Sequence, residues 1–164
     1  MNELKRILLV EDSPNDAELT LEALSEINLA NEIEWFNDGE QVLDYLNCRG
    51  AYTGRLPVNP ILILLDLKLP KMDGRQVLQE IRKTPRLCTI PVVVMTSSRE
   101  ESDLVNCYTN GVNAYVVKPV NFADFMESVK ALGVFWAAVN EPPPFSKDAV
   151  QRGHAAGEIL TNRL

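Results

Sequence analysis

The chain has 164 residues, of which 46% are hydrophobic and 24% charged. This length fits one domain of ordinary globular composition with a short tail, and it argues against a two-domain regulator. Lys and Arg number 16 against 23 Asp and Glu, which gives a net charge of −7, so the chain has no basic field for nucleic-acid phosphates and direct nucleic-acid binding is not expected.

Short apolar runs alternate with segments of helical period along the chain. The apolar runs have the length of buried strands, at residues 7–10, 33–36, 61–65, 92–95 and 114–117. The amphipathic segments that follow them predict helices at residues 17–27, 40–46, 77–81, 102–108 and 122–139. Strands that are each followed by a helix indicate an α/β fold built on a parallel sheet.

Capping residues mark the starts of the first and last helices. Ser13 is a typical N-cap, Pro14 suits the first helical position, and Asp16 places an acid in the first turn. Asn121 has the same role before the last helix, which is unusually long at 122–139.

Two segments fall outside the strand and helix alternation. Residues 49–60 are rich in Gly, Pro and Asn and predict a surface loop. The prolines at 142–144 end the last helix, so we expect a folded domain over residues 1–140 and a tail over 141–164. The tail is polar and weakly patterned, which predicts partial disorder with a possible short helix at 158–164.

The cysteines and the N-terminal residues indicate the cellular compartment in which the protein works. Cys48, Cys88 and Cys107 include no CxxC pair, and His154 is the single histidine, so neither a disulfide framework nor a zinc site is indicated. The four apolar residues at 7–10 are too few for a signal-peptide core, and no apolar run has membrane-spanning length. We expect a cytoplasmic protein with reduced thiols that does not bind membranes.

Polar residues stand at the ends of four predicted strands. Glu11 and Asp12 follow the first, Asp66 the third, Thr96 the fourth and Lys118 the fifth. Taken alone, each fits a helix cap, a solvated residue or a β-branched strand residue. Function in an open parallel sheet gathers at the carboxyl ends of its strands, and the joint occurrence of these residues there favours a site.

The residue types indicate phosphoryl chemistry. If the first and third strands are neighbours, three carboxylates converge, and their repulsion is relieved by a hard divalent cation, most plausibly Mg²⁺. Mg²⁺ commonly shares its coordination between carboxylates and phosphate oxygens. Asp66 could then act as nucleophile, while Lys118 and the Thr96 hydroxyl contact the transferred group.

Residues 5–139 resemble the receiver domains of two-component response regulators. The resemblance depends on Glu11-Asp12 after the apolar run 8–10, on Asp66 within 64–70, on the Met-Asp-Gly triplet at 72–74, and on the spacing of Thr96 and of Lys118-Pro119. It implies a flavodoxin-like, doubly wound sheet of five parallel strands in the order 2-1-3-4-5, with five helices, the last one extended.

The resemblance also implies a role for each site residue. Asp66 would accept a phosphoryl group from the phosphohistidine of a sensor histidine kinase. Glu11, Asp12, Asp66 and the backbone carbonyl of Lys68 would hold Mg²⁺. Lys118 would contact the phosphate, Thr96 would be the switch hydroxyl, and Tyr115 the aromatic switch residue. The Lys118–Pro119 bond is usually cis in this family.

Within the family, the chain is similar to single-domain regulators that partner phytochrome-type histidine kinases. The features behind this comparison are the loop 49–60, the long last helix ending in Phe135-Trp136, and the lack of an output domain after it. Where many receivers have Ala or Gly after the switch hydroxyl, this chain has Ser97 followed by Ser98, and we expect these larger side chains to crowd the site and alter access of the phosphodonor.

Aromatic residues on the last helix predict a dimer, and two other functions remain as alternatives. Phe122, Phe125, Phe135 and Trp136 are more apolar groups than one buried stripe requires, so we expect a homodimer through this helix. An aspartyl-phosphate phosphatase would have a second Asp two residues after the nucleophile, where this chain has Lys68. The other alternative is a receiver-like scaffold that works without phosphorylation.

Overall fold

The computed structural model describes residues 5–29 and 31–144. These residues form five strands, five helices and two short helical turns. In chain order the elements are β1 (Ile7–Val10), α1 (Pro14–Glu26), β2 (Ile33–Phe36), α2 (Gly39–Leu46), a 3₁₀ turn (Gly50–Tyr52), β3 (Leu62–Leu65), α3 (Gly74–Lys83), β4 (Val92–Thr96), α4 (Glu101–Thr109), β5 (Ala114–Val117), α5 (Phe122–Val134) and a π-helical turn (Phe135–Val139).

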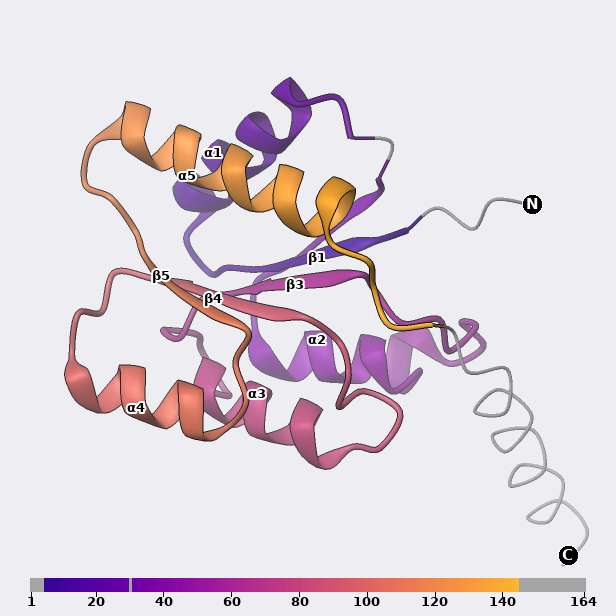
Figure 1. The fold of residues 1–164 in the computed structure, drawn as a ribbon. Coiled ribbons are helices and arrows are strands. Elements are labelled where there is room, and N and C mark those ends of the chain that lie inside the picture. Colours follow the sequence, from indigo (N-terminus) through magenta and orange to yellow (C-terminus); the bar gives the residue numbers. More distant parts are fainter. Residues whose placement is uncertain (1–4, 30, 145–164) are drawn as a thin grey trace, which may run out of the picture.

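The five strands form one parallel sheet in the order β2-β1-β3-β4-β5, as predicted. Helices α1 and α5 cover one face, and α2, α3 and α4 cover the other (Figure 1). Val10, the last residue of β1, pairs with Phe36 on one side and Leu65 on the other. The residues that follow β1 and β3 therefore reach the same edge of the sheet.

Two hydrophobic cores lie on opposite faces of the sheet. Alternate residues of β1 point into opposite cores. Leu8 and Val10 pack on the side of α2 and α3, and Ile7 and Leu9 pack on the side of α1 and α5. The prediction of five buried strands is correct for β1, β3 and β4 but wrong for the outer two. Strand β5 is half-buried throughout, and only the last residue of β2 is buried, because each has one neighbouring strand.

The predicted caps are present. The Ser13 side chain accepts a hydrogen bond from the Asp16 backbone N–H at 3.3 Å, and Asn121 accepts from the first turn of α5. The last helix continues to Val139 as predicted, although its final five residues form the π-helical turn. Helix α3 is longer than its apolar stripe because Asp73 and Gln76 form a capping box that starts it at Gly74.

The segment before β3 is more than a surface loop. Tyr52 packs edge-on against Phe36 and Tyr45, so the segment contributes to the core. Arg55 stacks over the Tyr45 ring at 3.9 Å and donates to the Tyr45 carbonyl at 3.0 Å. Arg86, beyond α3, donates to the Leu46 carbonyl and to Asn59. The two guanidinium groups thus bind the last carbonyls of α2.

The predicted helix at 158–164, like most of the expected tail, lies outside the described residues. Across the part of the chain that the structure describes, none of the helices combines the length and the apolar composition needed to cross a bilayer.

Candidate functional site

Three carboxylates meet where β1 and β3 end. Glu11 and Asp12 follow β1, Asp66 follows β3, and an oxygen atom of each lies within 4.8 Å of the others. Glu11 and Asp66 are buried, whereas Asp12 is exposed. The convergence expected from the sequence is therefore present, because β1 and β3 are neighbours in the sheet.

Lys118, directly after β5, extends its ammonium group into this cluster. Its Nζ atom lies 2.5 Å from Glu11 Oε2, 2.9 Å from Asp16 Oδ2 and 3.0 Å from Asp66 Oδ2. The contact with Asp16 was not predicted, since the sequence indicates only an acid in the first turn of α1. The two residues are 102 positions apart, and no local pattern relates them.

Negative charge exceeds positive charge in the cluster, and burial together with these charges shifts the pKa values of Glu11 and Lys118. Burial raises the pKa of Glu11 to about 7; the nearby charge of Asp66 adds to the rise, and the hydrogen bond from Lys118 opposes it. Burial alone would lower the pKa of Lys118, but hydrogen bonds to Glu11 and Asp16 outweigh it and raise this pKa. The site is thus short of cationic charge.

The donor set fits a hard divalent cation. All three groups offer carboxylate oxygens, they are close enough to share one ion, and they combine buried and exposed positions that leave room for water ligands. Lys68 follows Asp66 by two residues, its side chain is exposed, and its backbone N–H donates to Asp66 Oδ1 at 3.3 Å. That contact fixes the Asp66 carboxylate relative to the Lys68 backbone.

The end of β4 carries a connected set of hydrogen bonds. Buried Thr96 accepts from the Ser98 backbone N–H through Oγ1 at 3.3 Å, and the Tyr115 hydroxyl donates to the Ser98 carbonyl at 3.2 Å. The Ser98 hydroxyl donates to Asp103 at 2.7 Å, and Arg75 donates to the other oxygen of Asp103 at 2.9 Å. Ser98 therefore connects the Thr96–Tyr115 pair to α3 and α4.

Ser97, by contrast, is exposed. Of the two serines singled out in the sequence, only Ser98 belongs to this hydrogen-bond network.

Two further residues shape the site without being predicted as part of it. Trp35 donates its indole N–H to the Glu11 carbonyl at 2.8 Å. Gly74 packs so closely on the end of β3 that a Cβ atom there would lie 2.2 Å from the Asp66 carbonyl oxygen. The Met-Asp-Gly triplet is a signal for the second of these, whereas nothing in the sequence distinguishes Trp35 from an ordinary strand residue.

Two expectations about the neighbourhood are wrong. The described residues include no cis peptide bond, so Lys118–Pro119 is trans, the form that X-Pro bonds favour by about 0.5–1 kcal/mol. Phe125 is 5% exposed and belongs to the core on the α1 and α5 side, so it cannot be a dimer contact. Phe122 and Phe135 are exposed, and Trp136 is half-buried against that core.

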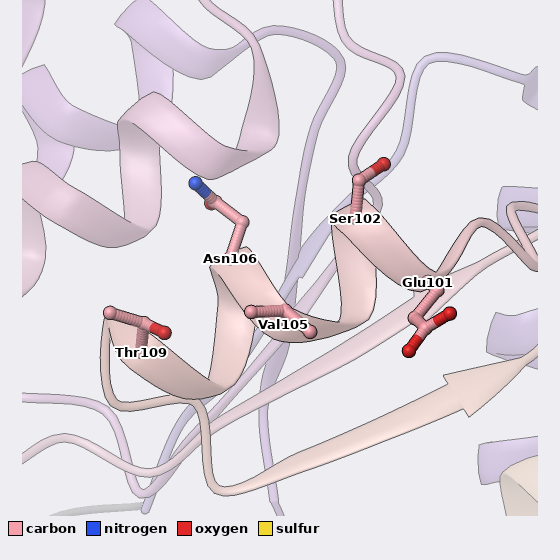
Figure 2. Close-up of a pocket in the computed structure, with 5 residues that line it drawn as sticks. All are labelled: Glu101, Ser102, Val105, Asn106 and Thr109. Carbon is pink, nitrogen blue, oxygen red and sulfur yellow. The ribbon is translucent and has the colours of Figure 1, made fainter.

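A shallow hollow also runs along α4, lined by Glu101, Ser102, Val105, Asn106 and Thr109. These side chains all project from the one helix (Figure 2). The hollow brings a single carboxylate and no cation together, so the chemistry is assigned to the acidic cluster.

Comparison with known proteins identifies the family. The model for the response regulator receiver domain matches residues 7–130. The chain is 42% identical to the response regulator Rcp1 of Synechocystis, over 82% of this chain and 90% of that protein. It is 41% identical to a probable methanogenesis regulatory protein, FilR2, of Methanothrix harundinacea, over 84% of this chain and 86% of that one.

Solved structures agree with the fold. The Mn²⁺-bound form of Rcp1 superposes with a TM-score of 0.81 at 41% identity, over 85% of this chain and 99% of that one. The phosphorylated cyanobacterial phytochrome response regulator RcpA has a TM-score of 0.81 at 40% identity, over 86% and 99%. The bacteriophytochrome response regulator RtBRR has a TM-score of 0.69 at 55% identity, over 93% and 92%.

Proposed function

The chain belongs to the response regulator receiver domains, and we propose that it accepts a phosphoryl group on Asp66 from the phosphohistidine of a sensor histidine kinase. The observation that carries this proposal is the cluster of Glu11, Asp12 and Asp66 within 4.8 Å, with the Lys118 ammonium 3.0 Å from Asp66. A nucleophile, a set of cation ligands and a fixed positive charge are thereby adjacent.

Asp66 acts as the nucleophile in this proposal. One of its carboxylate oxygens attacks the phosphorus, a P–O bond forms, and the P–N bond breaks with its electron pair left on the imidazole nitrogen. Lys118 donates to a phosphoryl oxygen, and the Thr96 hydroxyl supplies a further hydrogen bond. Glu11, Asp12, Asp66 and the Lys68 carbonyl would hold Mg²⁺, which when bound neutralises charge on the transferred oxygens.

The chain is then a phosphoacceptor signalling protein, and we expect it also to lose the phosphoryl group to water by its own hydrolysis. The switch we propose is the Thr96–Tyr115 pair. Both residues contact the backbone of Ser98, so a pull on Thr96 by the phosphoryl group acts on the same residue that holds the Tyr115 hydroxyl. The altered surface comprises α4, β5 and α5.

For the partner we propose a phytochrome-type histidine kinase in the cytoplasm. Two of the structural relatives are named as phytochrome or bacteriophytochrome response regulators, and one of them is more than half identical to this chain. The free cysteines of the described residues suit a reducing compartment. The net charge of −7 supports a protein partner rather than nucleic acid.

We propose homodimerisation through the last helix, with the contact set corrected to Phe122, Phe135 and the exposed part of Trp136. Phe122, at the start of α5, is 58% exposed, and Phe135, just after its end, is 49% exposed. Val134 and Val139 add exposed apolar area at the Phe135 end. Exposed apolar groups along one helix suit a two-fold contact between identical chains.

The test of phosphorylation is intact mass after incubation with Mg²⁺ and a small phosphodonor or a phosphohistidine kinase. Wild type is expected to gain one phosphoryl group, and Asp66→Asn none. Asp124→Asn is the matched control, because Asp124 is exposed on α5 and should leave phosphorylation unchanged. A wild-type protein that gains no mass with any competent donor would favour the phosphorylation-independent scaffold, and a gain retained in Asp66→Asn would move the acceptor elsewhere.

A further inference from the structure

We propose that Asp16 is a positioning residue that keeps Lys118 beside Asp66 when a cation occupies the acidic cluster. The inference rests on the proposed function, because it concerns the phosphoryl-contacting lysine. It adds to that function a residue outside the cation-binding set, located on α1 rather than at a strand end.

Asp16 differs from the other two partners of Lys118. The ammonium group has three N–H bonds and three carboxylate partners, namely Glu11, Asp16 and Asp66. Glu11 and Asp66 belong to the set whose oxygens lie within 4.8 Å of one another, and Asp16 does not. A cation bound to that set competes with Lys118 for Glu11 and Asp66 but leaves Asp16 available.

The position of Asp16 is fixed by the local structure. Ser13 caps the helix through the Asp16 backbone N–H, and the Thr20 hydroxyl donates to the Asp16 carbonyl at 2.8 Å. The Asp16 side chain is 35% exposed, while that of Lys118 is 10% exposed. The carboxylate thus stands at the rim of the cluster, on the outer side of a nearly buried ammonium group.

This placement has an electrostatic consequence. A divalent cation beside Glu11 and Asp66 repels the Lys118 ammonium and at the same time takes over two of its acceptors. Asp16 holds the ammonium by a charge-assisted hydrogen bond that does not involve the cation ligands. Lys118 therefore stays within reach of the phosphoryl oxygens, and the cation binds without leaving a buried ammonium group unpaired.

The test is calorimetric measurement of Mg²⁺ binding to the full chain. Asp16→Asn keeps the side-chain shape and removes the charge, and we expect it to weaken Mg²⁺ binding by roughly five- to tenfold, within the usual range for directly coupled groups. Asp124→Asn is the matched control, because Asp124 stands in the first turn of α5 and should change the affinity less than about twofold. Thermal melting of each variant checks that it is folded.

The decisive comparison uses Lys118→Met as a second background. Because Asp16 acts through Lys118, Asp16→Asn should change Mg²⁺ affinity by less than about twofold in that background. Asp16→Glu, which keeps the charge, should recover most of the wild-type affinity. An equal loss with and without Lys118, or a loss no larger than that of Asp124→Asn, would overturn the proposal.

The outcomes also separate this inference from the proposed function. Wild-type protein that binds no Mg²⁺ would contradict the proposed function and with it this inference. Normal Mg²⁺ binding with no effect of Asp16→Asn would overturn the positioning role alone, because the proposal that Asp66 accepts a phosphoryl group rests on the acidic cluster and Lys118.

Discussion

Replacement of Gly74 by alanine tests how the phosphoacceptor strand is held. Gly74 is the first residue of α3 and packs on the end of β3. A Cβ atom there would lie 2.2 Å from the Asp66 carbonyl oxygen and 2.7 Å from Leu67 Cα. Both are backbone atoms, so no side-chain rotation relieves the overlap. Either α3 or the end of β3 has to move.

The magnitude follows from the size of that overlap. Forced overpacking against rigid neighbours usually destabilises a protein by about 1–3 kcal/mol, and contact with two backbone atoms places Gly74→Ala at about 2–3 kcal/mol. Gly133→Ala is the matched control. Its Cβ atom would meet side-chain ends alone, those of Leu24 and Ile27 at 2.7 Å and that of Leu29 at 3.5 Å, and these can shift. Alanine in a helix interior regains about 1 kcal/mol, so the net change should stay below about 1 kcal/mol.

Urea denaturation of both variants provides the comparison. Gly74→Ala should lower the midpoint clearly, and at equal folded fraction it should also slow the gain of phosphoryl mass, because Asp66 is displaced. If Gly74→Ala unfolds like wild type, or if Gly133→Ala is the more damaging change, Gly74 does not hold α3 against β3 by close packing.

Three further predictions concern the cluster, the β4 network and the last helix. Burial raises the pKa of Glu11 to about 7, so protons compete with the cation for this carboxylate below neutral pH. Calorimetry should therefore show Mg²⁺ binding roughly tenfold more tightly at pH 8 than at pH 6. The Glu11→Gln variant should lose this pH dependence. Asp103→Ala removes the acceptor of the Ser98 hydroxyl and should speed amide hydrogen exchange in the loop after β4, whereas unchanged exchange would mean that the network does not hold that loop. Urea denaturation should show that Phe125→Ala lowers the free energy of unfolding by about 3–4 kcal/mol and Phe135→Ala by less than about 1 kcal/mol. Size-exclusion chromatography should show loss of the dimer for Phe135→Ala alone. The reverse order of stabilities would contradict the burial of Phe125.

Much of the fold is predictable because the spacing of apolar residues indicates which segments are buried strands and which are amphipathic helices. All five strands lie within one residue of the apolar runs that predict them, and capping residues predict the starts of α1 and α5. The convergence of Glu11, Asp12 and Asp66 follows from strand order once β1 and β3 are neighbours. These features depend on local pattern and on one topological rule.

The remaining features depend on contacts that local pattern does not encode. Asp16 reaches Lys118 across 102 positions, and Trp35 reaches the Glu11 carbonyl from an outer strand. Periodicity places Phe122, Phe125 and Phe135 on one helix but does not show which of them α1 covers. The structure buries Phe125 alone among these three.

Arg55 and Arg86, which both donate to carbonyls at the end of α2, limit how far this chain can be shortened. Residues 47–60 could be regarded as a dispensable insertion, suitable for replacement by a tight turn. Arg55, however, caps the C-terminal end of α2 with positive charge, because it donates to the Tyr45 carbonyl at 3.0 Å. Asn59 accepts a hydrogen bond from Arg86 at 2.8 Å and so holds that guanidinium beside the Leu46 carbonyl. Replacement of residues 47–60 would remove Arg55 from the Tyr45 carbonyl and would remove Asn59, which holds Arg86. A shortened chain therefore needs a new donor for the end of α2, such as a helix-ending glycine turn.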